Sequence, residues 1–373
     1  MASLIDYVTQ GSRIFCTSWK NRLAPKRYEG TANEICQQII KDCWNGRYLQ
    51  TSTGNFSQFW TRDFGWCTSS LISLKQEKEV QQTLRYALNR FKQYNKITTT
   101  ITPGGKPFDF PRPAVDSLPW FIHSIKVSKF PYYSFKPLLN KEINKFFKKF
   151  INKHTGLVKP GLPVSSIKDF SIRKSSCYDN CMVALLAKDL KSLKLYNPLQ
   201  DFDYPSLIKR HFWNGRFFFD DLTKKDYVAG DANLFPFLLG IINDKEMLKS
   251  ALEQIHVAGL DEPFPLKYTV SREHVHFITE EVALRNYESS AIWMHMGPLY
   301  VKLLQQLDKE RAKEYENRYT GLIEKHKNFL EVFDAQGKPF STPFYYCDSG
   351  MLWAANYLTL INFKKNKNKS YLK

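Results

Sequence analysis

Five segments of this 373-residue sequence place an acidic residue beside aromatic side chains or amides: 59–66, 114–120, 175–180, 230–234 and 345–353. A carboxyl group can give or take a proton, and carboxylate, amide and guanidinium groups bind hydroxyl groups. A tryptophan ring adds a flat apolar face. A sugar presents both hydroxyl groups and C–H faces, so the five segments together fit a carbohydrate site. Each segment alone also fits a plainer use, with the acid as a helix cap and the aromatic residue in the core.

Segments with helical periodicity surround these residues, and they fall into two classes. The amphipathic, heavily charged class comprises 33–44, 77–94, 142–154, 204–213, 244–256 and 309–333. The class that is apolar on nearly every side comprises 64–74, 117–125, 178–190, 233–242, 291–304 and 350–361. The two classes alternate six times along the chain. A helix that is apolar all round must be buried, so six pairs predict an inner ring of helices wrapped by an outer ring.

The spacing of the apolar segments indicates a sixfold repeat. They open about 57 residues apart on average, the length of one helical hairpin with its connections; the polar residues at their starts are Asp63, Asp116, Asp179, Asp231, Ser290 and Ser349. The motif Trp44-Asn-Gly-Arg-Tyr before the first apolar segment returns before the fourth as Trp213-Asn-Gly-Arg-Phe. This offset of three periods favours an ancient internal repeat.

The predicted fold class is therefore all-α, an (α/α)6 toroid of six helical hairpins with inner and outer helix rings. We expect residues 1–373 to form a single domain, with a basic, frayed tail at 364–373. Most of the long connections lead from an outer helix to the next inner one, so they gather where the inner helices begin. Helix N-termini favour carboxylates, and loops on a rigid scaffold commonly carry binding groups. This rim is the expected site.

The composition and charge of the chain limit the classes of partner that we expect it to bind. The formal net charge is +18, which could indicate binding to nucleic acid or to an anionic surface. The lysines lie in segments typical of solvated helix faces, however, and no nucleic-acid-binding motif is visible, so we expect no nucleic acid partner. No apolar stretch has the length of a membrane span or a signal peptide, and the seven scattered cysteines suit buried thiols. We expect a cytoplasmic protein with no membrane partner; the sequence carries no signal for an oligomeric state.

Five motifs follow one another in order: Trp60-Thr-Arg-Asp-Phe, Val115-Asp-Ser-Leu-Pro-Trp, Tyr178-Asp-Asn, Asp231-Ala-Asn, and Glu331-Val-Phe-Asp followed by Gly350-Met-Leu-Trp. Their order and spacing resemble the six-hairpin (α/α)6-barrel glycosidases, a superfamily that includes neutral invertases, trehalases, mannosylglycerate hydrolases and debranching α-glucosidases. The resemblance covers about residues 30 to 362. It implies a glycoside hydrolase that cleaves O-glycosyl bonds of a small saccharide, without a cofactor.

Inverting hydrolysis needs an acid that protonates the departing oxygen and, ~6.5–9.5 Å away, a base that deprotonates water. The resemblance assigns the acid to Asp179 and the base to Glu331. The chain has Ser-Cys-Tyr-Asp where trehalase-like proteins have Ser-Gly-Trp-Asp, so Asp116 stays open as the acid. Glu280 or Glu281 stays open as the base. The expected substrate is a short saccharide or an α-glycoside at a chain end.

The resemblance also implies a set of substrate-binding residues around these carboxyl groups. The residues expected to hold hydroxyl groups are Arg62, Asp63, Asp116, Asn180, Asp231 and Asn233. The residues expected to stack on sugar, at least two of which should instead be plain core, are Trp60, Trp66, Trp120, Trp293 and Trp353. A lysine-rich rim would also suit a phosphorylated or carboxylated saccharide.

Other functions remain open. His274 and His276 precede two glutamates, but no further ligand pattern follows, so we expect no metal site. One alternative is a six-hairpin protein that binds sugar without cleaving it. The other is a basic helical scaffold that binds acidic partners through its lysines, with steeply salt-dependent association.

Overall fold

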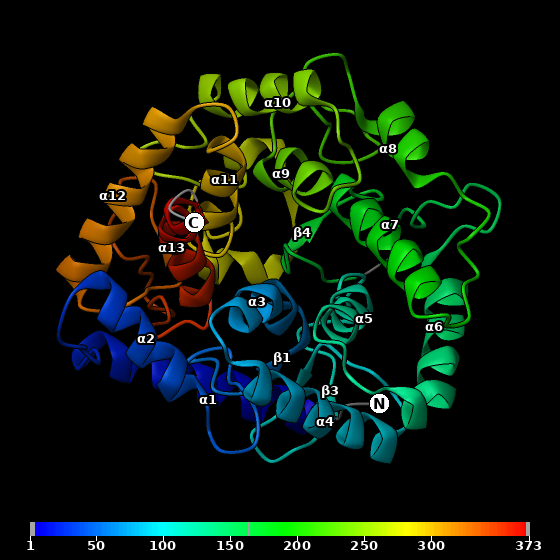
Figure 1. Cartoon of the computed structure of the whole chain (residues 1–373), viewed down its shortest axis with the longest axis horizontal. Helices are drawn as coiled ribbons and strands as arrows, with labels where there is room; N and C mark the ends of the chain where they lie inside the picture. The colour runs from blue at the N-terminus through cyan, green and yellow to red at the C-terminus, as the bar shows by residue number, and fades with distance from the viewer. Residues whose placement is uncertain (1–3, 163, 371–373) are drawn as a thin grey trace.

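The computed structural model describes residues 4–162 and 164–370, which form two concentric rings of helices (Figure 1). The inner ring comprises α3 (Thr61–Ser73), α5 (Ser117–Val127), α7 (Cys177–Ser192), α9 (Gly230–Leu238), α11 (Gly297–Leu304) and α13 (Ala354–Ser370). The outer ring comprises α2 (Ala32–Cys43), α4 (Glu77–Tyr94), α6 (Lys136–Phe150), α8 (Tyr204–Phe212), α10 (Lys245–Val257) and α12 (Lys309–His326). The predicted (α/α)6 toroid is confirmed. The side chains of the expected basic tail, 364–373, lie outside the described residues.

The inner ring is closed. Each inner helix packs against the next along the chain, and α13 returns to pack against α3. Helix α9 is buried continuously from Gly230 to Phe237. The outer helix α12 instead buries one stripe, formed by Ala312, Tyr315, Glu316, Tyr319 and Ile323. The two classes of helix read from the sequence are thus the two rings.

Local signals set the ends of the outer helices. Thr31 and Glu34 form a reciprocal capping box at the start of α2. Asp308 caps α12, where its side chain accepts a hydrogen bond from the backbone N–H of Arg311. At the other end of α12, Lys327 adopts the left-handed conformation with φ of 51°. The predicted helix 309–333 therefore ends earlier, at His326.

Short strands join the inner-helix starts. β1 (Phe59–Trp60), β2 (Thr100–Ile101) and β3 (Pro107–Phe108) form one antiparallel sheet. β4 (Ser171–Ile172) pairs with β5 (His276–Phe277), and β6 (Ile292–Trp293) pairs with β7 (Val332–Phe333). Short 3-10 helices span Tyr133–Phe135, Arg272–His274 and Thr279–Leu284. Because β6 takes the first residues of the predicted helix 291–304, α11 begins later.

The last inner helix also begins later than predicted. Gly350 has φ of +67°, a conformation that favours glycine and breaks the helical path. A Cβ at this position would lie 2.0 Å from Oγ1 of Thr53. Helix α13 accordingly starts at Ala354 and not at residue 350.

The repeated motif has the same conformation at both positions. Oδ1 of Asn45 accepts hydrogen bonds from the backbone N–H groups of Arg47 and Tyr48, each at 3.0 Å. Oδ1 of Asn214 accepts the corresponding bonds from Arg216 and Phe217, at 2.9 and 2.8 Å. Both motifs close a tight turn directly after an outer helix, which supports the internal repeat.

An additional N-terminal helix, α1 (Leu4–Leu23), was not predicted from the sequence. It runs behind α2 and α4 in the view of Figure 1. Arg13 Nη1 donates to the carbonyl oxygen of Asn55 at 3.0 Å, and Ser18 Oγ donates to that of Tyr346 at 3.0 Å. Helix α1 therefore braces the connections that lead into α3 and α13.

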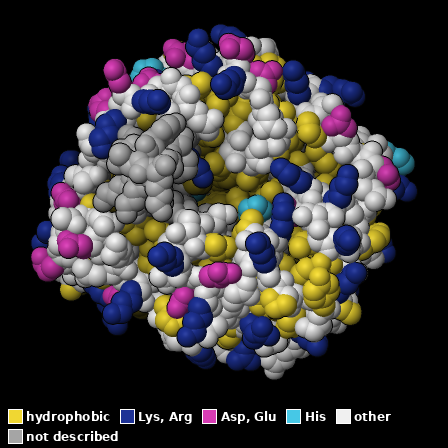
Figure 2. All heavy atoms as spheres, viewed as in Figure 1, with side chains coloured by type: hydrophobic (Ala, Val, Ile, Leu, Met, Phe, Trp, Pro, Cys, Tyr) yellow, Lys and Arg dark blue, Asp and Glu magenta, His cyan; other side chains and the backbone are white. Residues whose placement is uncertain are grey.

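The basic side chains are dispersed. On the face seen in Figure 2, Lys and Arg side chains are spread from the edge to the central hollow, with acidic side chains among them. In the described part of the chain, no helix is both long and apolar enough to cross a membrane.

The contact between α3 and α5 depends on Gly65. A Cβ at Gly65 would lie 2.5 Å from Cβ of Trp120, so Gly65→Ala should lower the free energy of unfolding by roughly 1–3 kcal/mol. Gly321 on α12 has open space around it, and Gly321→Ala should raise stability by ~0.5–1 kcal/mol. Urea titrations followed by circular dichroism compare the two variants. Equal midpoints for both would contradict the close approach of the inner helices.

Candidate active site

Carboxyl groups gather at the rim where the inner helices begin. Asp63, Asp179 and Asp231 lie in the first turns of α3, α7 and α9, and Asp116 directly precedes α5. All four side chains are buried. Helix N-termini stabilise the ionised form of such groups, while burial opposes it. The predicted concentration of acids at one rim is present in the structure.

A cavity of about 470 Å³ opens at this rim. The lining residues that the sequence had singled out are Trp60, Arg62, Asp63, Trp66, Trp293, Glu331 and Trp353. The further lining residues are Thr51, Phe56, Ile167, Asp169, Tyr287, Glu288 and His295. Aromatic faces and charged groups thus surround one space, supplied by segments from both ends of the chain.

Several polar atoms of the cavity residues are buried without a hydrogen-bond partner among the described residues. They are Nε1 of Trp60, Nε of Arg62, Nε1 of Trp66 and Nδ1 of His295. A buried donor or acceptor without a partner costs about 1–3 kcal/mol. Their concentration at one cavity indicates a polar ligand that completes these bonds.

Three hydrogen bonds hold the carboxyl group of Glu331 at the cavity. Its Oε1 accepts a hydrogen bond from Tyr287 Oη at 2.5 Å, and its Oε2 accepts from Tyr345 Oη at 2.6 Å and from the backbone N–H of Asp348 at 2.8 Å. Burial, followed by the nearby Asp348 carboxylate, raises the pKa of Glu331 to about 7. The group can therefore exchange a proton near neutral pH.

Arg62 joins the cavity to the carboxyl groups around it. Its side chain lies 3.9 Å from Asp63, 3.6 Å from Asp116 and 3.5 Å from Asp169. Trp353 Nε1 donates to Oδ1 of Asp63 at 3.1 Å. Burial raises the pKa of Asp63 to about 6, against the opposing effect of Arg62. One arginine therefore serves three carboxyl groups, and a proton near neutral pH relieves the excess of negative charge.

Asp179 lies outside this cavity. It lines a neighbouring cavity of about 770 Å³, together with Arg173 and Lys168. Burial raises the pKa of Asp179, opposed by Arg173, and Ser166 Oγ donates a hydrogen bond to its carboxylate. The structure does not bring Asp179 and Glu331 into one cavity.

The segment 166–169 forms the wall between the two cavities. Ser166 and Lys168 face the cavity of Asp179, whereas Ile167 and Asp169 face the cavity of Glu331. This alternation is that of an extended chain. Arg62 donates to the carbonyl oxygen of Ser166, and Glu288 accepts from the backbone N–H of Phe170 at 2.8 Å, so the wall is fixed on both sides.

Asp116 and Trp120 also lie behind the cavity. Tyr178 Oη donates to Oδ2 of Asp116 at 3.1 Å, and Trp120 Nε1 donates to that hydroxyl at 3.1 Å. Burial raises the pKa of Asp116 to about 7; Arg62 opposes the shift and Asp179 adds to it. Trp120 meets Trp66 edge to face and packs in the core between α3 and α5.

Asp231 belongs to a fully buried ionic cluster. Lys168 Nζ lies 3.3 Å from Asp220 and 3.2 Å from Asp231, and Arg173 Nη1 lies 3.4 Å and 2.9 Å from the same two carboxylates. Two cations thus neutralise two anions. These ion pairs hold the start of α9 in place, so Asp231 has a structural role.

The two asparagines serve the backbone. Asn180 Oδ1 accepts from the N–H of Val158 at 3.0 Å, and Asn233 Oδ1 accepts from the N–H of Phe218 at 2.7 Å. Both side-chain amides also donate to nearby oxygens, and both residues are fully buried. They tie each inner helix to the turn before it, and neither lines the cavity of Glu331.

Of the two alternative bases, Glu281 does not line the cavity. Glu281 is buried, pairs with Arg272 and accepts from the backbone N–H of Asn286 at 3.1 Å. Glu281 therefore stabilises the connection between Arg272 and Asn286. The side chain of Glu280 lies outside the described residues.

Asp169, Tyr287, Glu288 and His295 were not singled out from the sequence. Glu288 accepts from the backbone N–H groups of Asp169 and Phe170, and burial, followed by Asp169, raises its pKa to about 7. These residues stand in long connections or beside a short strand, where no helical pattern marks their direction. The only sequence signal was their placement in the connections that enter the rim.

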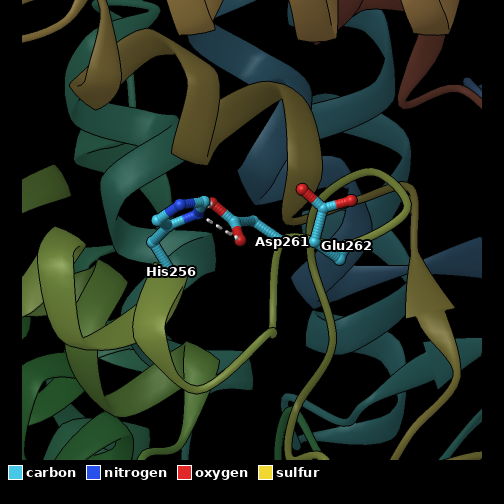
Figure 3. Close-up of side chains that lie close together, drawn as sticks. All are labelled: His256, Asp261 and Glu262. Atoms are coloured by element: carbon cyan, nitrogen blue, oxygen red, sulfur yellow. Dashed lines mark hydrogen bonds and ion pairs between the residues drawn. The ribbon is translucent and has the colours of Figure 1, made fainter.

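One histidine-carboxylate cluster in the described part of the chain has metal-like spacing (Figure 3). It comprises His256, Asp261 and Glu262, away from the cavity. Asp261 already pairs with His256 at 3.2 Å and accepts from Tyr300 Oη at 2.8 Å. A carboxylate oxygen of Glu262 lies within 4.8 Å of the ligand atoms of this pair, and its Oε2 lies 3.8 Å from Arg318. Protein groups thus already bond the carboxylates of Asp261 and Glu262.

Solved glycosidase structures share this architecture. A rhamnosidase from Klebsiella oxytoca with rhamnose bound matches with a TM-score of 0.63 and 9% identity, over 89% of this chain and 63% of the rhamnosidase. A bacterial glucoamylase complexed with acarbose matches with a TM-score of 0.63 and 15% identity, over 88% of this chain and 55% of the glucoamylase. The GH63 mannosylglycerate hydrolase from Thermus thermophilus in complex with glucose matches with a TM-score of 0.59 and 10% identity, over 89% of this chain and 100% of the hydrolase.

The fold is therefore that of the six-hairpin glycosidases. The chain spans less than two thirds of the rhamnosidase and of the glucoamylase, and the whole length of the mannosylglycerate hydrolase. No protein-family profile and no curated protein matches the sequence.

The raised pKa of Glu331 predicts how stability depends on pH. The folded protein binds its proton up to a pH of about 7, against 4.5 for the free side chain, so the contribution of this group is present below pH 4.5 and is lost as the pH rises to about 7. Wild-type unfolding free energy should fall over this range. Glu331→Gln should reduce the fall by roughly 3 kcal/mol at most.

Urea unfolding at several pH values measures this difference. Glu246→Gln, which changes an exposed residue on α10, is the matched control and should leave the wild-type curve in place. Parallel curves for Glu331→Gln and wild type would show that the Glu331 pKa is not raised.

Proposed function

We propose that this protein is a glycoside hydrolase whose catalytic cavity is the one lined by Glu331. The observation that carries the proposal is a carboxyl group with a pKa of about 7 in an aromatic cavity that also holds buried polar atoms without partners. Tryptophan faces suit the C–H faces of a sugar ring, and the polar atoms suit its hydroxyl groups.

The matched structures support the same ligand class. The molecules bound in these structures are rhamnose, acarbose and glucose. All three are sugars or sugar-like, and all three proteins share the toroid with this chain. A short saccharide, or the end of a longer one, is the corresponding substrate proposed here.

Glu331 would act as the general base. The hydroxyl groups of Tyr287 and Tyr345 hold both of its oxygens, so its carboxylate has a fixed orientation. In the ionised form it takes a proton from a water molecule as that water attacks the anomeric carbon. The sequence-based assignment of the base to Glu331 thus remains our proposal.

Two carboxyl groups compete as proton donor. Asp169 lines the cavity with Glu331 and lies beside Glu288, whose pKa is raised to about 7 by burial and by the Asp169 carboxylate. Asp179, the donor implied by the family resemblance, stands behind the wall 166–169 and would need that wall to move. We propose Asp169 as donor in the arrangement described.

The reaction then balances without a cofactor. The donor carboxyl passes its proton to the glycosidic oxygen as the bond from the anomeric carbon to that oxygen breaks. Water forms the new bond to the anomeric carbon, and its proton goes to Glu331. Attack from the face opposite the leaving group inverts the configuration.

A sugar-binding protein without hydrolytic activity is the second candidate. The separation of Asp179 from Glu331 by the wall 166–169 favours it. The two functions differ in one observable, because both predict sugar binding and only the first predicts release of a reducing sugar.

A panel of α- and β-glycosides scored for released reducing sugar tests the hydrolase. Glu331→Gln should lower kcat/KM at least about 100-fold, the usual contribution of a general base. Asp169→Asn should lower it similarly, whereas Asp179→Asn should have a smaller effect. Asp201→Asn, an exposed residue after α7, is the matched control and should retain wild-type activity. If Asp179→Asn lowered kcat/KM more than Asp169→Asn did, the proton donor would be Asp179 and not Asp169.

The pH profile gives an independent check. Because Glu331 must be ionised to act as base, kcat/KM should rise as the pH passes upward through about 7. A profile that is already flat between about pH 5 and pH 8 would contradict the role of Glu331 as the base.

A further inference from the structure

His295 lies at the cavity with its ring held on several sides. It lies two residues after the end of β6 and is 1% exposed. The ring stacks on Trp66 with centroids 4.3 Å apart and planes 4° apart, and it meets Trp293 and Trp353 edge to face at 5.0 Å each. Packing by three tryptophans fixes the orientation of the imidazole.

The hydrogen bonds of Tyr268 determine which nitrogen of His295 carries the proton. Tyr268 Oη donates its single proton to the carbonyl oxygen of Ile167 at 2.8 Å. The same hydroxyl lies 3.3 Å from Nε2 of His295. Since the tyrosine proton is already used, Nε2 must carry a hydrogen and donate it to the tyrosine oxygen.

The other nitrogen is then a hydrogen-bond acceptor. Burial, followed by the positive charge of Arg62, lowers the pKa of His295 well below its ordinary value, so the ring is neutral. A neutral imidazole protonated at Nε2 presents a lone pair at Nδ1. Nδ1 is buried and has no partner within the described chain.

The charges around the cavity disfavour an anionic ligand. Among its lining residues, Arg62 is the one cation in the described chain, against the carboxyl groups of Asp63, Asp169, Glu288 and Glu331. The surplus of acidic groups contrasts with the net charge of +18 of the whole chain. A phosphate or carboxylate group would meet both these acids and a lone pair.

We propose that Nδ1 of His295 accepts a hydrogen bond from a hydroxyl group of an uncharged sugar ring, and that this site selects neutral over phosphorylated or carboxylated saccharides. The inference rests on the proposed function to the extent that the cavity binds sugar. His295 is a specificity-determining residue here, because it offers an acceptor that only an O–H or N–H donor can satisfy.

Nitrogen-15 spectra of histidine-labelled protein test the tautomer without any ligand. The signal that is missing in His295→Phe identifies the residue. We expect a neutral ring protonated at Nε2 throughout the range from about pH 8 to pH 5. Tyr268→Phe, which removes the hydroxyl group that fixes the tautomer, should produce a mixture of the two neutral forms. A ring protonated at Nδ1, or at both nitrogens, in the wild type overturns the proposal.

Titration with sugars tests the selectivity. The probes are D-glucose, L-rhamnose, glucose 6-phosphate and glucuronate, followed by tryptophan fluorescence and by the Nδ1 signal. A neutral sugar should shift the Nδ1 signal, bind at least about 10-fold more tightly than the anionic probes, and bind roughly 5- to 10-fold more weakly to His295→Phe. Tighter binding of an anionic probe, or binding that leaves Nδ1 unchanged, overturns the inference.

The two proposals fail in different ways. If a neutral sugar binds and shifts the Nδ1 signal but no glycoside is cleaved, the hydrolase fails and the role of His295 stands. If a neutral glycoside is cleaved, but neutral sugars leave the Nδ1 signal unchanged and bind His295→Phe as tightly as the wild type, the hydrolase stands and the role of His295 fails.

Discussion

Closure of the inner helix ring is the constraint on which the rest of the structure depends. Each inner helix is apolar on nearly all sides, so it needs apolar neighbours on both flanks and an outer helix behind it. A row of hairpins would leave the two end helices exposed, and packing of α13 against α3 removes that exposure. Because all inner helices then point the same way, their N-termini and the connections before them meet at one rim.

That rim places carboxyl groups where water is scarce. Ionisation of a buried carboxyl group is unfavourable, and the cations available are few: Arg62 serves three carboxyl groups, and Lys168 and Arg173 serve Asp220 and Asp231. In the first group, burial raises the pKa of Asp63 to about 6 and that of Asp116 to about 7, whereas the second group forms an ionic cluster. The same burial therefore produces a chemically reactive region and a structural one side by side.

The sequence motifs mark the rim where the inner helices begin, but they do not show how each side chain is placed there. Glu331 and four of the tryptophans named from the sequence line the cavity. Asn180 and Asn233 belong to the same set of motifs, but their side chains form hydrogen bonds with backbone groups. A motif fixes which residue stands at a helix start, but the direction of its side chain depends on which loop fills the space beside it. The segment 166–169 takes that space next to Asp179, and no periodic pattern marks it.

By itself, the sequence determined the order and class of the helices in the two rings, because apolar periodicity and helix-start residues are local properties of the chain. It also determined the toroid, since six buried helices have to close on one another. Only the tertiary structure decided which carboxyl groups share a cavity with Glu331, how α1 braces the rim, and which nitrogen of His295 is free. Those outcomes depend on contacts between residues more than a hundred positions apart in several cases, such as Tyr268 with Ile167, and such contacts leave no trace in the local pattern.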